Sequence, residues 1–160
     1  MNSAADETFA ARFNLHYAAR VTQRQATLCK RIGQLIDLVS LLAGSSAFVM
    51  VVKGSDALAA VAAAVLATVQ ISQVVFDVSA KAAQAALAAK AYSKALNTLP
   101  RDAGAEAIDA AKARAGEWDE VQPNEVVRAL AYNDAVLELG AATEHLMPVP
   151  RSAWMVRLLC

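Results

Sequence analysis

Two apolar runs dominate the chain, over residues 32–52 and 57–78, and only Lys53-Gly54-Ser55-Asp56 separates them. Each run is about 20 residues long, which at ~1.5 Å rise per residue matches the ~30 Å hydrocarbon core of a bilayer. Neither run contains Lys or Arg. The glycine and the capping residues between the runs favour a tight turn. The pattern therefore predicts an antiparallel hairpin of two membrane-spanning helices.

A buried hairpin in a water-soluble bundle is the alternative, because the second run is rich in alanine and such segments also form buried helices. Residues 38–52 argue against it, since their polar side chains are limited to Ser40, Ser45 and Ser46 and leave no hydrophilic face for water. A cleaved signal peptide is not expected, because about thirty residues of charged sequence precede the first run.

Composition favours helices from end to end. Alanine has the highest helix propensity, and no alternating apolar pattern bounded by turn residues indicates a strand, so the predicted fold is all-α. The formal net charge is +0 and no basic cluster occurs, which argues against a nucleic-acid partner. The spacings of Cys29, Cys160, His16 and His145 match no zinc or redox motif, so neither a metal nor a cofactor is expected.

Helical sequence continues outside both runs. Over residues 4–31 apolar side chains recur near every helical turn, and no strong helix breaker separates this helix from the first span. Their stripe comprises Phe9, Phe13, Tyr17, Val21, Leu28 and Ile32. The second span is expected to continue without a break through residues 79–99, until Pro100 stops it. The two extensions would pair as a cytosolic stalk, so residues 1–160 are expected to form a single domain.

Two shorter cytosolic helices are expected in residues 100–160, packed on the stalk. One covers residues 105–115. The other takes Asn124 as its N-cap and closes at Gly140. Its predicted stripe comprises Val126, Val127, Leu130, Asn133 and Leu137.

The C-terminal tail and the basic residues predict how the chain lies relative to a membrane. Over residues 152–160, Trp154 and its apolar neighbours mix with arginine, so the tail is expected either on the membrane surface or packed on the stalk. Lys and Arg flank the hairpin on the side away from its turn, whereas the turn carries only Lys53, offset by Asp56. This bias predicts that both termini are cytoplasmic.

Five polar residues within the two runs form the candidate site: Gln34, Asp37, Gln70, Gln73 and Asp77. Counted from the turn, Asp37 and Gln73 lie at nearly the same depth. A charge in hydrocarbon costs ~2.5–3.5 kcal/mol on insertion scales, so these groups should face another helix or water. Either they form hydrogen bonds across the hairpin that serve packing, or several hairpins assemble so that they line a cation-conducting path.

Several features of the chain occur together in one known family. They are the basic N-terminal helix with Tyr17 and Arg20, the two close spans, Glu117-Trp118 with Pro123, the stretch Arg128-Ala129-Leu130-Ala131-Tyr132-Asn133-Asp134, and Trp154 in an apolar tail. In these features the chain resembles the small stand-alone SLATT proteins, the two-span effector domain of bacterial nucleotide second-messenger conflict systems. The resemblance implies a bacterial inner-membrane protein that forms pores or perturbs the membrane in defence, with sensing supplied by a cytosolic partner or by the cytosolic helices.

The expected function is that of an oligomeric membrane effector or channel-like protein, whose partners are lipid and further copies of the chain. A phage-type two-span holin and a non-conducting structural membrane scaffold are the alternatives. No P-loop, nucleophile elbow, HExxH or CxxC motif occurs, so an enzyme is not expected.

Overall fold

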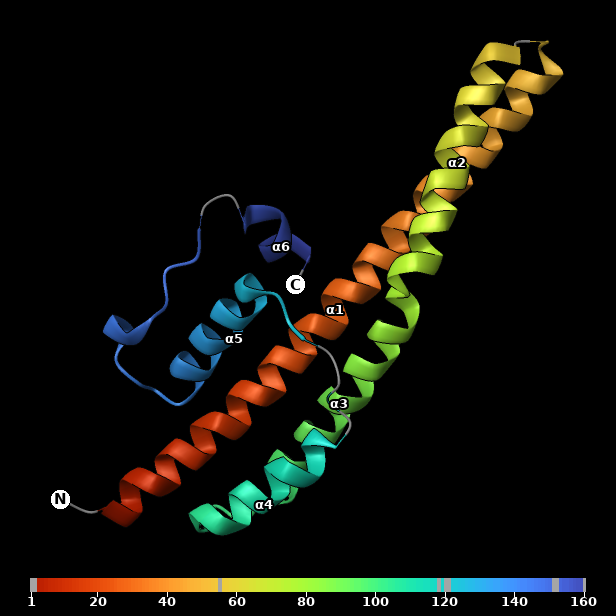
Figure 1. Ribbon diagram of the computed structural model, residues 1–160. Coiled ribbons are helices and arrows are strands. Elements are labelled where there is room, and N and C mark those ends of the chain that lie inside the picture. Colours follow the sequence, from red (N-terminus) through yellow and green to blue (C-terminus); the bar gives the residue numbers. More distant parts are fainter. Residues whose placement is uncertain (1–2, 55, 118, 120–121, 151–152, 160) are drawn as a thin grey trace. The chain divides into compact units, whose positions relative to one another are not determined.

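The computed structural model describes residues 3–54, 56–117, 119, 122–150 and 153–159; within these ranges it leaves out the side chains of residues 3, 47, 48, 50–52, 56, 73, 74, 76 and 143. All regular structure in the described residues is helical, which confirms the all-α prediction (Figure 1). The elements are α1 (Ser3–Val52), α2 (Asp56–Phe76), α3 (Val78–Thr98), α4 (Ala105–Gly116), α5 (Glu125–Glu138), the 3-10 turn η1 (Thr143–His145) and α6 (Trp154–Leu159).

The chain forms two compact units. The first, which we call the core unit, combines Met1–Leu28 with Lys81–Cys160. The second, the hairpin unit, is Cys29–Ala80. Helix α1 contributes to both, and its continuity from Ser3 to Val52 confirms that the N-terminal helix runs into the first apolar run without a break.

Two alanines and a leucine on α1 lie at the centre of the core unit. Ala11, Leu15 and Ala19 are spaced by four residues, so they lie on one face of α1, and all three are buried. They belong to one apolar cluster with residues of α3 and α4, namely Ala88, Tyr92, Ile108 and Ala115. The alanines permit close approach of the helices. The guanidinium of Arg12 donates to the carbonyls of Pro100 and Arg101, which ties the loop between α3 and α4 to α1.

A second face of α1 meets α5. The rings of Phe13 and Tyr17 are stacked, and Tyr132 of α5 meets both edge-on, at centroid distances of 5.2 and 6.3 Å. Phe9, which was predicted to share this stripe, is 50% exposed. It lies one turn before Phe13, at the exposed start of the helix.

Helix α5 begins and ends as predicted. The Asn124 side chain accepts a hydrogen bond from the Val126 backbone N–H at 2.9 Å, which caps the helix, and Gly140 ends its last turn with φ of +67°. Its predicted stripe is partly wrong, because Leu137 is 57% exposed. The buried side chains are instead Val127, Leu130, Ala131, Ala135 and Val136.

The hairpin unit departs from the prediction at its second helix. Gly54 has φ of +71° in the turn after α1, as a tight turn requires. The expected unbroken second helix is wrong, because α2 ends at Phe76 and Asp77 has φ of +43° before α3 begins. A left-handed residue interrupts the ladder of helical hydrogen bonds, and Asp is among the residues that tolerate this conformation best.

Among the residues that the structure describes, no helix combines the length and the apolarity that a crossing of the membrane requires.

Candidate functional site

Both helices of the hairpin unit expose large apolar side chains. On α1, Leu35, Leu38 and Leu42 are 48%, 51% and 59% exposed, and their spacing of three and four residues places them on one face. On α2, Val61 and Val75 are 61% and 69% exposed. Other apolar side chains share this exposure, namely Val39, Leu41, Val49, Leu58, Val65 and Ile71. Two helices cannot cover each other's outer faces, so this surface lacks cover within the hairpin unit.

The better-covered residues of the hairpin unit include small residues and some larger apolar ones, such as Ile36 and Leu66. Along α1 they include Ser40, Ala43 and Gly44, and along α2 they include Ala59 and Ala62. All are half-buried, whereas Cys29 is the buried residue among the described side chains of this unit. The hairpin unit therefore has a half-buried seam of small and larger apolar residues rather than a core.

Of the five predicted site residues, Gln70 makes a contact between the two helices. Its amide nitrogen donates to the Ser40 hydroxyl at 3.4 Å. Gln34 and Asp37 are exposed and lie three residues apart on α1, and the side chain of Gln73 lies outside the described part. Asp77 is exposed and lies between α2 and α3, at the break of the second helix.

Three hydroxyl groups in the apolar runs are satisfied inside their own helices. Ser45 donates to the carbonyl of Leu41 at 2.8 Å, and Thr68 and Ser72 donate to the carbonyls four residues before them at 2.9 and 2.8 Å. A polar group that is bonded in this way needs no partner from the solvent, which lowers the cost of an apolar environment.

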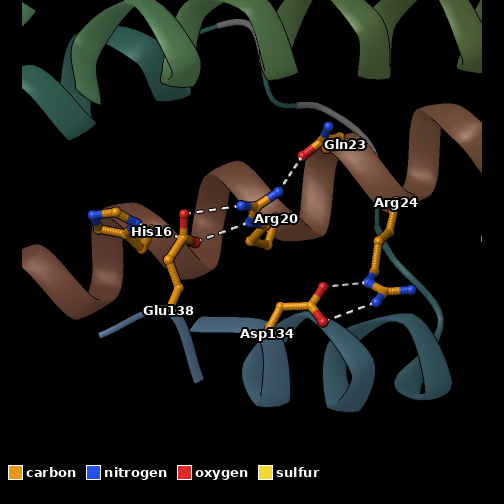
Figure 2. Close-up of polar contacts among 6 residues, drawn as sticks. All are labelled: His16, Arg20, Gln23, Arg24, Asp134 and Glu138. Carbon is orange, nitrogen blue, oxygen red and sulfur yellow. Dashed lines mark hydrogen bonds and ion pairs between the residues drawn. The ribbon is translucent and has the colours of Figure 1, made fainter. Parts of the chain in front are cut away.

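The core unit carries a charged cluster that the sequence analysis did not pair (Figure 2). Arg20 donates to both oxygens of Glu138 at 2.9 and 3.0 Å, and Arg24 donates to both oxygens of Asp134 at 2.6 and 2.9 Å. His16 Nδ1 lies 3.4 Å from a Glu138 oxygen. Arg20 and Arg24 are among the basic residues that flank the hairpin and predict cytoplasmic termini. One feature of the sequence indicates this pairing. The two arginines of α1 are four residues apart, and so are the two acidic residues of α5, Asp134 and Glu138.

The electrostatics of this cluster follow from its geometry. The hydrogen bond from Arg20 lowers the pKa of Glu138, and the same bond raises the pKa of Arg20. Bidentate pairs of this kind fix orientation as well as adding energy. The cluster therefore holds α5 on α1 by geometry and charge.

A second polar pair lies at the edge of the alanine-rich core. The hydroxyl of Tyr92 donates to Asp119 at 3.4 Å. Burial, and then the negative charge of Asp119, raise the pKa of Tyr92 to about 12. Burial also raises the pKa of Asp119. The shift of Tyr92 favours its neutral phenol in the folded protein, and the shift of Asp119 favours its protonated carboxyl.

The described residues contain no group of three or more His, Cys, Asp or Glu side chains that would hold a metal ion. Comparison of the chain with protein-family models, curated proteins and solved structures gives no match. The resemblance to SLATT proteins therefore stays a prediction.

Proposed function

We propose that the hairpin unit inserts into a lipid bilayer and that the chain acts as an oligomeric membrane effector with both termini in the cytoplasm. The observation that carries this proposal is the exposure of large apolar side chains on both helices of one unit, from 42% at Val39 to 69% at Val75. Soluble monomers rarely expose contiguous apolar patches above a few hundred Å².

Lipid is the occupant that fits this surface best. The exposed side chains lie on α1 and on α2, and they extend from Leu35 near one end of the hairpin to Leu58 beside its turn. A single partner helix would cover one face, whereas lipid surrounds a hairpin on all sides. The internally bonded hydroxyls of Ser45, Thr68 and Ser72 support an apolar surrounding, in which unsatisfied groups cost several kcal/mol.

The polar residues of α1 support assembly into an oligomer. Gln34 and Asp37 are exposed in the single chain and share one helical face. Because a charge is costly in hydrocarbon, further copies of the hairpin would shelter this face around an aqueous path. A ring of aspartates would favour cations. The Lys and Arg bias of the flanks supports the cytoplasmic placement of both termini.

A non-conducting membrane scaffold is the second candidate. The hydrogen bond between Gln70 and Ser40 favours it, because this bond pairs two polar groups within one hairpin and leaves neither to a conducting path.

Flotation of the full chain with phosphatidylcholine liposomes tests insertion. Leu41→Arg adds a charge at a position that is 68% exposed on the hairpin, and we expect it to reduce the floated fraction strongly, because Arg costs ~2.5–3.5 kcal/mol at the centre of a span. Leu137→Arg is the matched control, since Leu137 is 57% exposed on the core unit. Equal flotation of the two variants would contradict insertion of the hairpin.

Ion leakage from liposomes separates the effector from the scaffold. Asp37→Asn preserves shape and hydrogen bonding while it removes the charge. An effector with Asp37 on its path should show altered leakage at unchanged thermal stability. Unchanged leakage, with stability unchanged or raised, would reject conduction past Asp37 and favour the scaffold.

A further inference from the structure

The core unit carries a hollow whose lining residues all lie outside the hairpin unit. Its volume is about 520 Å³, within the roughly 300–1,000 Å³ that is usual for small-molecule sites. Gln23 of α1 lines one side of it. The other lining residues come from α3, namely Ala89, Lys90, Ser93, Lys94, Asn97 and Thr98.

The charge of this hollow is positive and uncompensated along α3. Lys90 and Lys94 are exposed and stand four residues apart, a spacing at which like charges on a helix repel each other. Residues 78–98 contain neither Asp nor Glu, and the described lining residues include no acid. The basic residues opposite, Arg20 and Arg24, are already bound to carboxylates of α5. An anion in the hollow would relieve the repulsion between the two lysines.

Hydrogen-bond donors surround the two ammonium groups. The side-chain oxygen of Gln23 accepts from Arg20 at 2.9 Å, so its amide nitrogen is left to donate elsewhere, and Figure 2 shows this nitrogen directed away from Arg20. Ser93 adds a hydroxyl from a position between the two lysines of α3, and Asn97 adds an amide three residues after Lys94. Two cations with three neutral donors suit an oxygen-rich ligand that carries at least two negative charges.

We propose that this hollow binds a soluble phosphorylated small molecule, with Lys90 and Lys94 as the groups that recognise its phosphates. Lysine binds phosphate as a point charge, and charge-assisted hydrogen bonds are stronger than neutral ones. The volume leaves space for an organic group beside the phosphates. The site lies wholly within the core unit, so it does not depend on the membrane function proposed above.

Calorimetric titration of the full chain in neutral detergent with inorganic pyrophosphate tests the site. We expect binding to the unchanged protein, and a loss of affinity of about tenfold or more for Lys90→Gln and for Lys94→Gln. Lys81→Gln is the matched control, because Lys81 is an exposed lysine of α3 that does not line the hollow. All three changes affect exposed side chains, and circular dichroism verifies that the helices remain folded.

Two control titrations exclude ionic strength and lipid headgroups as sources of the binding heat. Sodium chloride at matched ionic strength should give no saturable heat. In nanodiscs of phosphatidylcholine, addition of phosphatidic acid should leave the pyrophosphate affinity unchanged. Absence of pyrophosphate binding, or equal weakening by Lys81→Gln, would overturn the proposal. Lysine-dependent binding of phosphatidic acid without a response to pyrophosphate would assign the hollow to lipid headgroups and would also overturn it.

Discussion

The core unit and the hairpin unit use similar alanine-rich helices and reach opposite states of burial. In the core unit Leu15 is 1% exposed and Val127 is 0% exposed, whereas in the hairpin unit Leu41 and Val75 are 68% and 69% exposed. In the core unit α1 has neighbours on two faces, α3 with α4 on one and α5 on the other. In the hairpin unit each helix has one neighbour. The number of covering helices, and not the apolarity of the sequence, decides which side chains are buried.

This difference identifies the unit whose apolar side chains are not covered by the chain itself. A helix must bury its apolar stripe against another element, and the core unit achieves this with its own residues. The hairpin unit leaves the same requirement to something outside the chain. The core unit thus covers its apolar stripes with its own residues, and under the proposed function the hairpin unit is the part whose behaviour would change with lipid or with further copies.

The largest expected effect tests this contrast directly. Leu15→Ala should lower the free energy of unfolding of the core unit by about 2–5 kcal/mol, because it leaves a cavity at a fully buried site. Leu41→Ala removes the same atoms from an exposed site and should change the free energy of unfolding by less than about 0.5 kcal/mol. Chemical denaturation in neutral detergent, followed by near-ultraviolet circular dichroism, measures both. Comparable losses would break the distinction between the two units.

A second prediction uses alkaline pH to weaken the core unit alone. The pKa of Tyr92 is raised to about 12, so folding favours the neutral phenol. The neutral phenol contributes its full share of the unfolding free energy below the ordinary tyrosine pKa of about 10. This contribution is lost as the pH rises from about 10 through about 12. By pH 11.5 the loss should reach about 2 kcal/mol of unfolding free energy. Tyr92→Phe should remove this pH dependence.

The measurement is denaturation at pH 9 and at pH 11.5 for the two proteins, with tyrosinate absorbance recorded in parallel. The hairpin unit contains no tyrosine over residues 29–80, so its association with liposomes should not follow the same titration. An equal alkaline loss in Tyr92→Phe would show that another group is responsible.

Much of the fold could be predicted from local sequence signals. The turn at Gly54, the N-cap Asn124 and the continuity of α1 each depend on residues that are neighbours along the chain, and all three are confirmed. The break at Asp77 could not be predicted in this way, because the flanking residues favour helix and a single backbone angle decides it.

The site was less predictable because its contacts join distant residues. Gln70 contacts Ser40 rather than another residue of the predicted cluster, since the rotation of each helix about its axis sets which side chains meet. The pairing of Arg20 with Glu138 spans 118 positions, and the sequence alone does not reveal which helix packs on which. The spacing of residues along the chain predicts which side chains share one face of a helix. It does not predict which other helix packs on that face.

A third prediction sharpens the comparison at the helix break in the hairpin unit. Asp77→Gly should stabilise the break, because glycine adopts positive φ without the steric cost that other residues have, and Asp77→Ala should weaken it by about 1 kcal/mol. Hydrogen exchange of the amides around Phe76 and Val78 measures the effect. Slower exchange in Asp77→Gly than in Asp77→Ala would contradict the assigned backbone conformation.

The smallest expected effect concerns the charged cluster of the core unit. Arg20 lowers the pKa of Glu138, so the ion pair contributes stability above the ordinary carboxyl pKa of about 4.3, and this contribution is lost as the pH falls through the lowered folded value. Both side chains are 37% exposed, and solvent screening therefore limits the contribution to below about 1 kcal/mol. Glu138→Gln should accordingly destabilise the core unit at pH 6 and have a smaller effect at pH 3. Because the pair is screened by ions, the difference at pH 6 should also shrink in 1 M salt. If the substitution costs the same at both pH values, the charge of Glu138 does not stabilise the contact between α5 and α1, and packing together with the separate pair of Arg24 and Asp134 must hold this helix.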